Sequence, residues 1–231
     1  MHEQYYIKLR VSTSIMRTFL FNMPAMGLPA RRLLAGGLLA TGLLASSLLM
    51  SCHSPIDPNK PRVVIKTRAG DIEVELYPRQ APRTVGAFLS YVDSGYYKGG
   101  NFYRVLNEDN QVTGAGFSKL IQGGIWKTKH KLATSLPGVP HETTQQTHIL
   151  HTDGVISLAR MEPGSATTEF FICVGDQPGF DYGGENNPDG QGYAAFGKVV
   201  KGMDVVRSIY AMPENDQSFV PPIPILTITR E

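Results

Sequence analysis

The sequence offers histidine and acidic side chains that could bind a metal ion. His141, His148 and His151 lie near Glu142, and these residue types are common zinc ligands. The run His141-Glu142-Thr143-Thr144-Gln145 lacks the second histidine, four residues after the first, that a helical zinc pair requires. We therefore expect a solvated loop and no metal site.

Two further groups of residues suggest chemistry that their spacing does not support. Asp181, Glu185 and Asp189 lie among glycines but miss the spacing of a calcium loop. Ser157 and Ser165 have histidines nearby in the sequence, but no nucleophile elbow surrounds either serine. We expect neither a calcium site nor a hydrolase.

Three pairs of sequence blocks follow one another along the chain. They are Asn101 to Val105 with Ile121 to Gly124, Gly154 to Arg160 with Thr168 to Ile172, and Ala195 to Val199 with Gly202 to Val206. In their order and rough spacing these blocks resemble cyclophilins. The resemblance covers residues 62–231 and implies a mainly β fold: a closed eight-stranded antiparallel barrel capped by two α-helices, with a groove for an X-Pro peptide. It also implies peptidyl-prolyl cis-trans isomerase (rotamase) activity without a cofactor.

The implied reaction is rotation about an amide bond, whose barrier is about 18–20 kcal/mol. In the twisted amide the prolyl nitrogen becomes pyramidal and can accept a hydrogen bond, which a fixed donor can supply. The resemblance assigns this catalytic role to Arg104, and assigns to Gln122 the orientation of the substrate carbonyl and the arginine. On their own, Arg104 would be a surface arginine on a strand and Gln122 a hairpin residue beside Gly123 and Gly124.

A proline ring needs an apolar pocket, and the matching positions are Phe171 and Leu120, with Phe180 as the far wall. Successive side chains on a strand point to opposite faces. We therefore expect Phe170 to point into the core while Phe171 faces the substrate.

Three more positions complete the substrate-binding set implied by the resemblance. Ala159 and Arg160 match the strand edge whose backbone pairs with the bound peptide. Tyr193 falls where eukaryotic cyclophilins carry a histidine, and it offers an aromatic face and a hydroxyl.

The sequence departs from the cyclophilin pattern at the rim of the pocket. Lys119 lies where a pocket phenylalanine is usual, and the segment before it is longer than usual, so Phe117 is expected to supply that ring. Gly179 replaces a common aromatic residue, which should weaken binding of cyclosporin more than catalysis. Tyr103 replaces a common histidine, from which little is expected.

Short elements separated by turns must position these residues. Strands are expected at 62–67 and 71–76, joined by a hairpin turn at Arg68 to Asp71. Apolar residues at helical spacing predict a helix from Pro82 until Ser94-Gly95 ends it. We expect further strands at 102–106, 120–122, 154–158, 170–174, 194–199 and 223–230, a second helix at about 205–211, and long site-shaping loops at 107–118 and 175–192.

The N-terminal part has the layout of an export signal. Arg31-Arg32 precedes an apolar segment, Leu33 to Met50, and Ser51 and Cys52 follow it. This order resembles the lipobox of bacterial lipoproteins, in which the cysteine is acylated. We predict a signal peptide with an upstream extension at 1–51, a lipidated Cys52 with a flexible linker at 52–61, and the isomerase domain at 62–231; an uncleaved anchor helix is the alternative.

Charge and cysteine content exclude other classes of protein. The formal net charge is +2 at pH 7, and much of the excess positive charge lies within residues 1–32, so a nucleic-acid surface is not expected. The only two cysteines, Cys52 and Cys173, lie in such different contexts that a disulfide is not expected; Cys173 should be a small buried hydrophobe.

The sequence therefore predicts a monomeric prolyl isomerase. Its partners would be proline-containing unfolded polypeptides and, through acylated Cys52, a lipid bilayer of the bacterial cell envelope. The domain would face the periplasm, with the cell surface as an alternative. Two other functions stay open: a cyclophilin-like chaperone or peptide-binding scaffold with weak catalysis, and an adhesin-like surface lipoprotein.

Overall fold

The computed structural model describes residues 57, 59–111 and 117–231. The predicted signal peptide and Cys52 lie outside these residues. Within the described ranges, no helix has both the length and the apolar character needed to cross a membrane.

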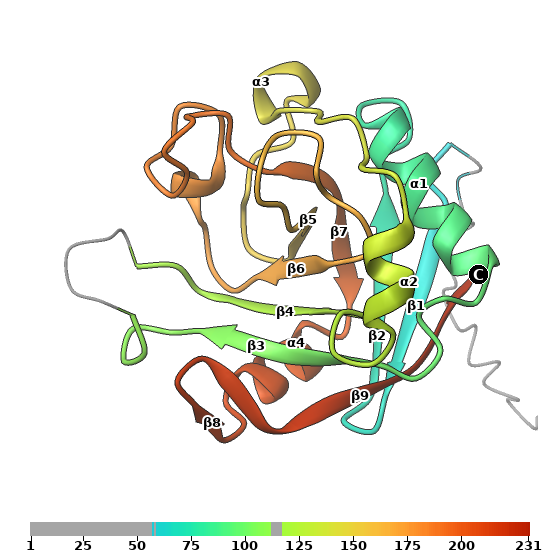
Figure 1. Ribbon diagram of the computed structural model, residues 1–231, viewed down its shortest axis with the longest axis vertical. Helices are drawn as coiled ribbons and strands as arrows, with labels where there is room; N and C mark the ends of the chain where they lie inside the picture. Colours follow the sequence, from blue (N-terminus) through green and yellow to red (C-terminus); the bar gives the residue numbers. More distant parts are fainter. Residues whose placement is uncertain (1–56, 58, 112–116) are drawn as a thin grey trace, which may run out of the picture. The chain divides into compact units, whose positions relative to one another are not determined.

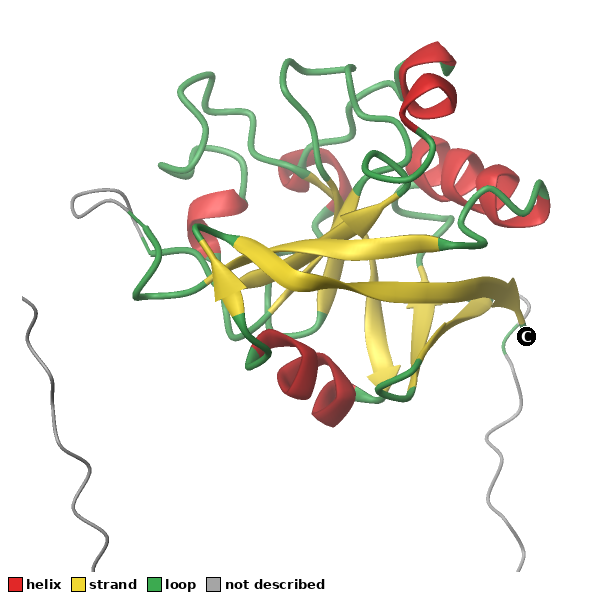
Figure 2. Ribbon diagram, turned by 60° about the horizontal axis from the view of Figure 1, so that its bottom comes forward, coloured by secondary structure: helices red, strands yellow, loops and turns green. Residues whose placement is uncertain are grey.

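Eight antiparallel strands form a closed barrel, and a ninth, β8, lies outside it (Figures 1 and 2). The order around the barrel is β1-β2-β7-β5-β6-β4-β3-β9, and pairing of β1 with β9 closes it. The described strands are β1 (Arg62–Thr67), β2 (Asp71–Leu76), β3 (Gly100–Leu106), β4 (Leu120–Gly124), β5 (Val155–Leu158), β6 (Phe170–Cys173), β7 (Ala194–Lys201), β8 (Glu214–Asn215) and β9 (Ser218–Arg230).

The β1–β2 hairpin has the predicted boundaries because β1 is a β-branched run and β2 alternates apolar and polar residues. Val63 and Ile65 on β1 are fully buried, while Val64 between them is only partly buried. The turn requires Gly70, whose φ is +139° and where a Cβ atom would lie 2.7 Å from a methyl carbon of Val205. The predicted strands and hairpin are confirmed.

Helices α1 (Pro82–Asp93) and α4 (Met203–Tyr210) lie on opposite sides of the strands (Figures 1 and 2). These are the two predicted helices. The structure adds two short ones, α2 (His130–Ser135) and α3 (Thr144–Thr147), and a 3-10 turn, η1 (Pro178–Phe180). Helices of six and four residues leave too little periodicity to be recognised in a sequence.

The expectation of a solvated loop at His141 to Gln145 is wrong, because Glu142 is buried and caps α1. Its carboxylate accepts hydrogen bonds from the backbone N–H groups of Arg83 (3.2 Å) and Thr84 (2.8 Å) and from the Thr84 hydroxyl (2.6 Å). A negative charge at a helix N-terminus is favourable. Contacts between residues so far apart in the sequence are not visible in local spacing.

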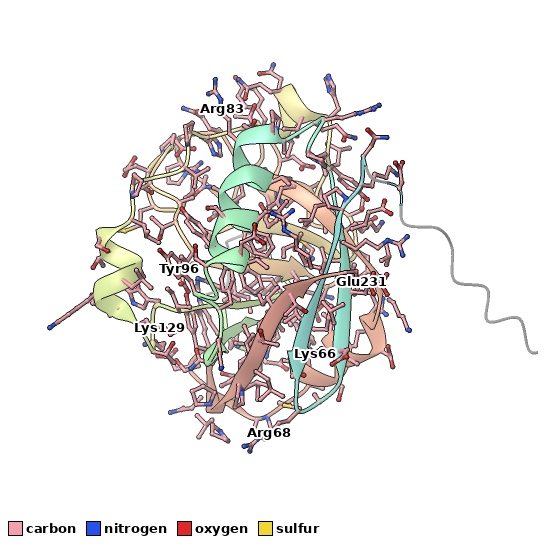
Figure 3. All side chains as sticks on the ribbon, turned by 90° about the vertical axis from the view of Figure 1, so that its right-hand side faces the viewer. Lys66, Arg68, Arg83, Tyr96, Lys129 and Glu231 are labelled. Carbon is pink, nitrogen blue, oxygen red and sulfur yellow. The ribbon has the colours of Figure 1, made fainter. Side chains whose placement is uncertain are left out.

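The barrel interior is closed by an aromatic cluster around Phe170, which is fully buried as predicted. Its ring centroid lies 6.0 Å from that of Phe88 on α1, 5.7 Å from Tyr97 and 5.8 Å from Phe102 on β3. These edge-on contacts join α1 to the barrel wall. The loop after α1 is held by Lys129, whose ammonium donates to the Tyr96 carbonyl oxygen at 2.7 Å (Figure 3).

Candidate active site

A single row of residues crosses four neighbouring strands of the barrel wall. Arg104 on β3 pairs with Gln122 on β4, Gln122 pairs with Phe171 on β6, and Phe171 pairs with Ser157 on β5. Side chains in register on antiparallel strands lie on the same face. The barrel therefore brings together a cation, an amide and an aromatic ring that are distant in sequence.

The guanidinium of Arg104 is held between two amide oxygens. Its Nη1 donates to Gln122 Oε1 at 3.2 Å, and its Nε and Nη2 donate to Gln217 Oε1 at 3.1 and 2.8 Å. No salt bridge to Arg104 is present among the described residues. Its positive charge is fixed in position but not neutralised.

Gln217 is a site residue that the sequence did not predict. It lies in the turn between β8 and β9 with a φ of 67°. Its side-chain Nε2 donates to the Asn110 carbonyl oxygen at 3.0 Å. Its backbone N–H donates to Glu214 (2.8 Å), and its carbonyl oxygen accepts from the Val105 N–H (2.8 Å). Because Gln217 is 113 residues from Arg104, no local sequence signal points to it.

The amide of Gln122 is oriented by Tyr103, a residue from which little was expected. Gln122 Nε2 donates to the Tyr103 hydroxyl at 2.8 Å, which leaves Oε1 to face Arg104. Burial, and then the nearby charge of Glu169, raises the pKa of Tyr103 well above its usual value, so the phenol stays protonated.

Glu169, whose charge acts on Tyr103, is a buried carboxyl group. Its Oε1 accepts from the N–H groups of Ile125 (2.8 Å) and Trp126 (2.9 Å) and from the Thr168 hydroxyl (3.0 Å). Its Oε2 has no hydrogen-bond partner among the described residues. Burial raises the pKa of Glu169 despite these donors.

A small apolar cluster outside the barrel forms beside Arg104. The ring centroid of Phe171 lies 5.2 Å from Phe180 and 5.2 Å from Tyr193, and Phe180 lies 5.3 Å from Tyr193. Leu120 packs into the same cluster, as does Cys173, which is fully buried, as predicted. This surface is apolar and aromatic, as a pocket for a pyrrolidine ring requires.

His151 packs against this cluster. Its ring stacks against Phe171 at 6.0 Å, its Nδ1 lies 2.8 Å from Asp181 Oδ1, and its Nε2 lies 3.1 Å from Ser157 Oγ. Serine, histidine and aspartate thus lie in the order of a hydrolase triad. Ser157 is nevertheless fully buried, and His151 is 1% exposed, so substrate cannot reach the hydroxyl and the group has a structural role.

The residues directly after β5 form another part of the site. The Ala159 N–H donates to the Glu169 carbonyl oxygen at 2.9 Å. The side chain of Arg160 binds the Asp189 carboxylate and the Gly192 carbonyl oxygen, and its guanidinium lies 5.4 Å from the ring centroid of Tyr193. The Arg160 guanidinium, with the Gln191 N–H, lowers the pKa of Asp189 to about 2. Arg160 therefore ties the 175–192 loop to the edge of the site.

These residues surround one groove with a volume of about 390 Å³. Eight of the predicted site residues line it, whereas Phe117 does not; of the other lining residues, most come from the two loops expected to shape a site. The predicted residues in the groove are Arg104, Gln122, Leu120, Phe171, Phe180, Ala159, Arg160 and Tyr193, and the unpredicted ones are Leu106, Gln111, Ser118, Glu185, Asn186 and Pro188.

Neither the two departures at the pocket rim, Lys119 and Gly179, nor Phe117, which was expected to compensate, lines the groove. Phe117 is 51% exposed and, with Gly179, lines a separate neighbouring hollow. Lys119 forms an ion pair with Glu108 and lines a third hollow, beside Tyr210 of α4. In the described part of the chain, no three histidine, cysteine or acidic side chains are grouped so as to hold a metal ion.

Comparison with known proteins gives consistent matches. The family described as "Cyclophilin type peptidyl-prolyl cis-trans isomerase/CLD" matches residues 62–230. Peptidyl-prolyl cis-trans isomerase A of Dickeya dadantii is 40% identical over 148 residues, which are 64% of this chain and 70% of that protein. Peptidyl-prolyl cis-trans isomerase B of Escherichia coli is 36% identical over 148 residues, 64% of this chain and 82% of that protein.

A solved structure supports the fold. The crystal structure of a cyclophilin-type peptidyl-prolyl cis-trans isomerase from Cryptosporidium parvum matches with a TM-score of 0.58 and 22% identity. The match covers 74% of this chain and 98% of that one. A second structure of that protein, obtained in the presence of the dipeptide Ala-Pro, matches with a TM-score of 0.57.

Proposed function

This chain belongs to the cyclophilin family of peptidyl-prolyl cis-trans isomerases, and we propose that Arg104 is the group that lowers the barrier to rotation. The chain isomerises X-Pro bonds. The observation that supports Arg104 is its fixed position at the apolar cluster, between the oxygens of Gln122 and Gln217.

The hydrogen bonds of Arg104 leave donors for the substrate. A guanidinium has five N–H donors, and three are engaged, so two remain, one each on Nη1 and Nη2. As the amide twists, the prolyl nitrogen gains an accessible lone pair, and a remaining N–H donates to it. Because the guanidinium is already oriented, little reorganisation is needed at the moment of rotation.

The other groove residues bind and align the substrate. The proline ring occupies the cluster of Phe171, Leu120, Phe180 and Tyr193, while the backbone at Ala159 and Arg160 pairs with the peptide. Gln122 orients the substrate carbonyl as well as Arg104. No cofactor is required, since no covalent bond changes.

Exchange and binding measured together test this role. We expect the full chain in mild detergent to accelerate cis-trans exchange of an Ala-Pro peptide in two-dimensional NMR. Arg104→Ala should lower kcat/KM roughly a hundredfold while the peptide still binds. Arg230→Ala, which removes an exposed arginine that is paired with Asp93 and does not line the groove, is the control. If wild type binds the peptide without accelerating exchange, the chain is a peptide-binding scaffold.

We propose that this domain acts in the bacterial cell envelope, tethered through acylated Cys52. The apolar segment 33–50 before Cys52 supports this, as do the roughly ten residues between Cys52 and the first strand, which provide a spacer. Unfolded exported polypeptides are then its substrates, since X-Pro isomerisation takes tens to hundreds of seconds unaided. Radiolabelled palmitate should enter wild type but not Cys52→Ser, and the variant should leave the membrane fraction; equal labelling would refute the anchor.

A further inference from the structure

A second hollow adjoins the groove that holds Arg104. Its volume is about 420 Å³. Two residues, Glu185 and Asn186, line both the hollow and the groove, so the two are adjacent. The hollow also involves Phe117, Asp176, Pro178 and Gly179.

Hydrogen bonds hold the 175–192 loop where it forms the hollow. Asn186 Nδ2 donates to the Ser118 hydroxyl at 2.8 Å, and the Asn186 backbone N–H donates to the Gly179 carbonyl oxygen at 3.0 Å. At Gly184, a Cβ atom would lie 2.4 Å from the Gly179 oxygen, so a side chain there would push these two backbone segments apart.

One wall of the hollow is an exposed aromatic ring. Phe117 is 51% exposed, although phenylalanine is usually buried. An aromatic ring beside a binding groove offers an apolar face to an aliphatic stem and a negative π-face to a cation.

The carboxylates of the hollow are not neutralised by cations. Glu185 forms no side-chain hydrogen bond or ion pair with any described residue, and Asp176 accepts only the Asp153 backbone N–H, at 2.9 Å. In contrast, Asp189 of the same loop is paired with Arg160. Among the described residues, the groove thus carries an uncompensated positive charge at Arg104, and the adjacent hollow carries uncompensated carboxylates.

We propose that this hollow is a specificity subsite for a lysine or arginine side chain close to the proline of the substrate. The proposal rests on the proposed function, because it takes the groove to hold the X-Pro bond. The aliphatic stem of the basic residue packs against Phe117, and its charged head faces Glu185 and Asp176. Since the hollow shares walls with the groove, the basic residue lies about one to three residues from the proline, at roughly 3.5 Å per residue.

Matched peptides test the subsite. Each contains Ala-Pro in a neutral background, with lysine, norleucine or glutamate two residues before or after the proline. For the full chain at low salt, we expect kcat/KM for the lysine peptide to exceed that for the glutamate peptide roughly fivefold on one side of the proline. Added salt should reduce this ratio, because the carboxylates are exposed.

Variants assign the preference to the hollow. In Asp176→Asn/Glu185→Gln, the lysine to glutamate ratio should fall close to one. Glu162→Gln, which removes an exposed carboxylate outside both depressions, should keep the wild-type ratio. Because the readout is a ratio between peptides, a general loss of activity cancels.

Three results would overturn the proposal: equal rates for all peptides with wild type, a norleucine peptide that matches the lysine peptide, or a lysine preference that survives in the double variant. Each leaves isomerisation of the neutral peptide intact. Absence of exchange with that neutral peptide would instead refute the proposed function.

Discussion

Removal of the Gln217 side chain tests whether Arg104 must be held in place. Gln217→Ala deletes the acceptor of two of the three side-chain hydrogen bonds of Arg104, at 3.1 and 2.8 Å. The bond to Gln122 at 3.2 Å remains, so the guanidinium stays in the groove but can rotate about that contact.

The expected loss follows from the charge and exposure of Arg104. A hydrogen bond to a charged group contributes about 1.5–3 kcal/mol when nothing replaces it. Arg104 is half-buried, so water can replace part of the lost interaction. We expect a net loss of about 1 kcal/mol in transition-state stabilisation, which is roughly a fivefold decrease in kcat/KM. The decrease should fall on kcat, because the proline pocket is unchanged.

Exchange spectroscopy on an Ala-Pro peptide gives kcat and KM, and the Arg104 Nε–H resonance reports its hydrogen bond directly. Asp216→Ala is a matched control: it lies in the same turn, also has a positive φ (47°), and its side chain has no hydrogen bond to a described residue. The backbone strain that alanine introduces is thus similar in the two variants.

The reasoning would be refuted if Gln217→Ala lost no more activity than Asp216→Ala. It would also be refuted if the Nε–H resonance were unchanged and only KM rose. Thermal unfolding of both variants measures any shared loss of stability.

Three other substitutions separate the functions of neighbouring side chains. Phe170→Ala should destabilise the fold by about 3–5 kcal/mol in urea unfolding, because it empties the aromatic core, whereas Phe171→Ala should mainly raise KM in the exchange assay; similar effects of the two would contradict their assignment to opposite faces. Tyr103→Phe should lower kcat roughly threefold, since Gln122 Nε2 loses its acceptor, and an unchanged kcat would show that this contact is dispensable. Burial raises the pKa of Glu169 above its ordinary 4.5, so the folded state holds this proton more tightly and the unfolding free energy should fall, relative to Glu169→Gln, as pH rises above that value. If the difference in unfolding free energy between wild type and Glu169→Gln, measured by urea titration, did not change with pH, this prediction would be contradicted.

Much of the barrel could be predicted from the sequence, because its strands are β-branched or apolar runs between turn residues. The segment 71–76 alternates strictly, 62–67 is a β-branched run, and α1 has apolar residues at helical spacing, so the boundaries agree with the structure. The closing strand was expected from residue 223 but begins at Ser218, because the prolines at 221, 222 and 224 obscure its pattern.

The groove residues predicted from motif blocks lie on barrel strands or directly beside them. Arg104, Gln122 and Phe171 are on β3, β4 and β6, and the register of these paired strands brings them together. Phe117 was expected in the same pocket but lies in the next hollow, because the length of a loop does not determine its path.

The supporting residues could not be predicted, because their contacts join distant turns. Gln217 reaches Arg104 only after β9 pairs with β3, and its positive φ occurs without a glycine to signal it. Glu142 reaches the start of α1 across 58 residues. Such contacts depend on tertiary structure and leave no local pattern.

The central claim is that a forked guanidinium, held by two amides, stabilises the twisted X-Pro bond. The most direct test is the exchange rate of a saturating Ala-Pro peptide with wild type and with Arg104→Lys. Lysine keeps the positive charge but cannot bridge Gln122 and Gln217 as the fork does. We predict at least a roughly tenfold lower rate for Arg104→Lys with unchanged peptide binding; a wild-type rate would contradict the claim.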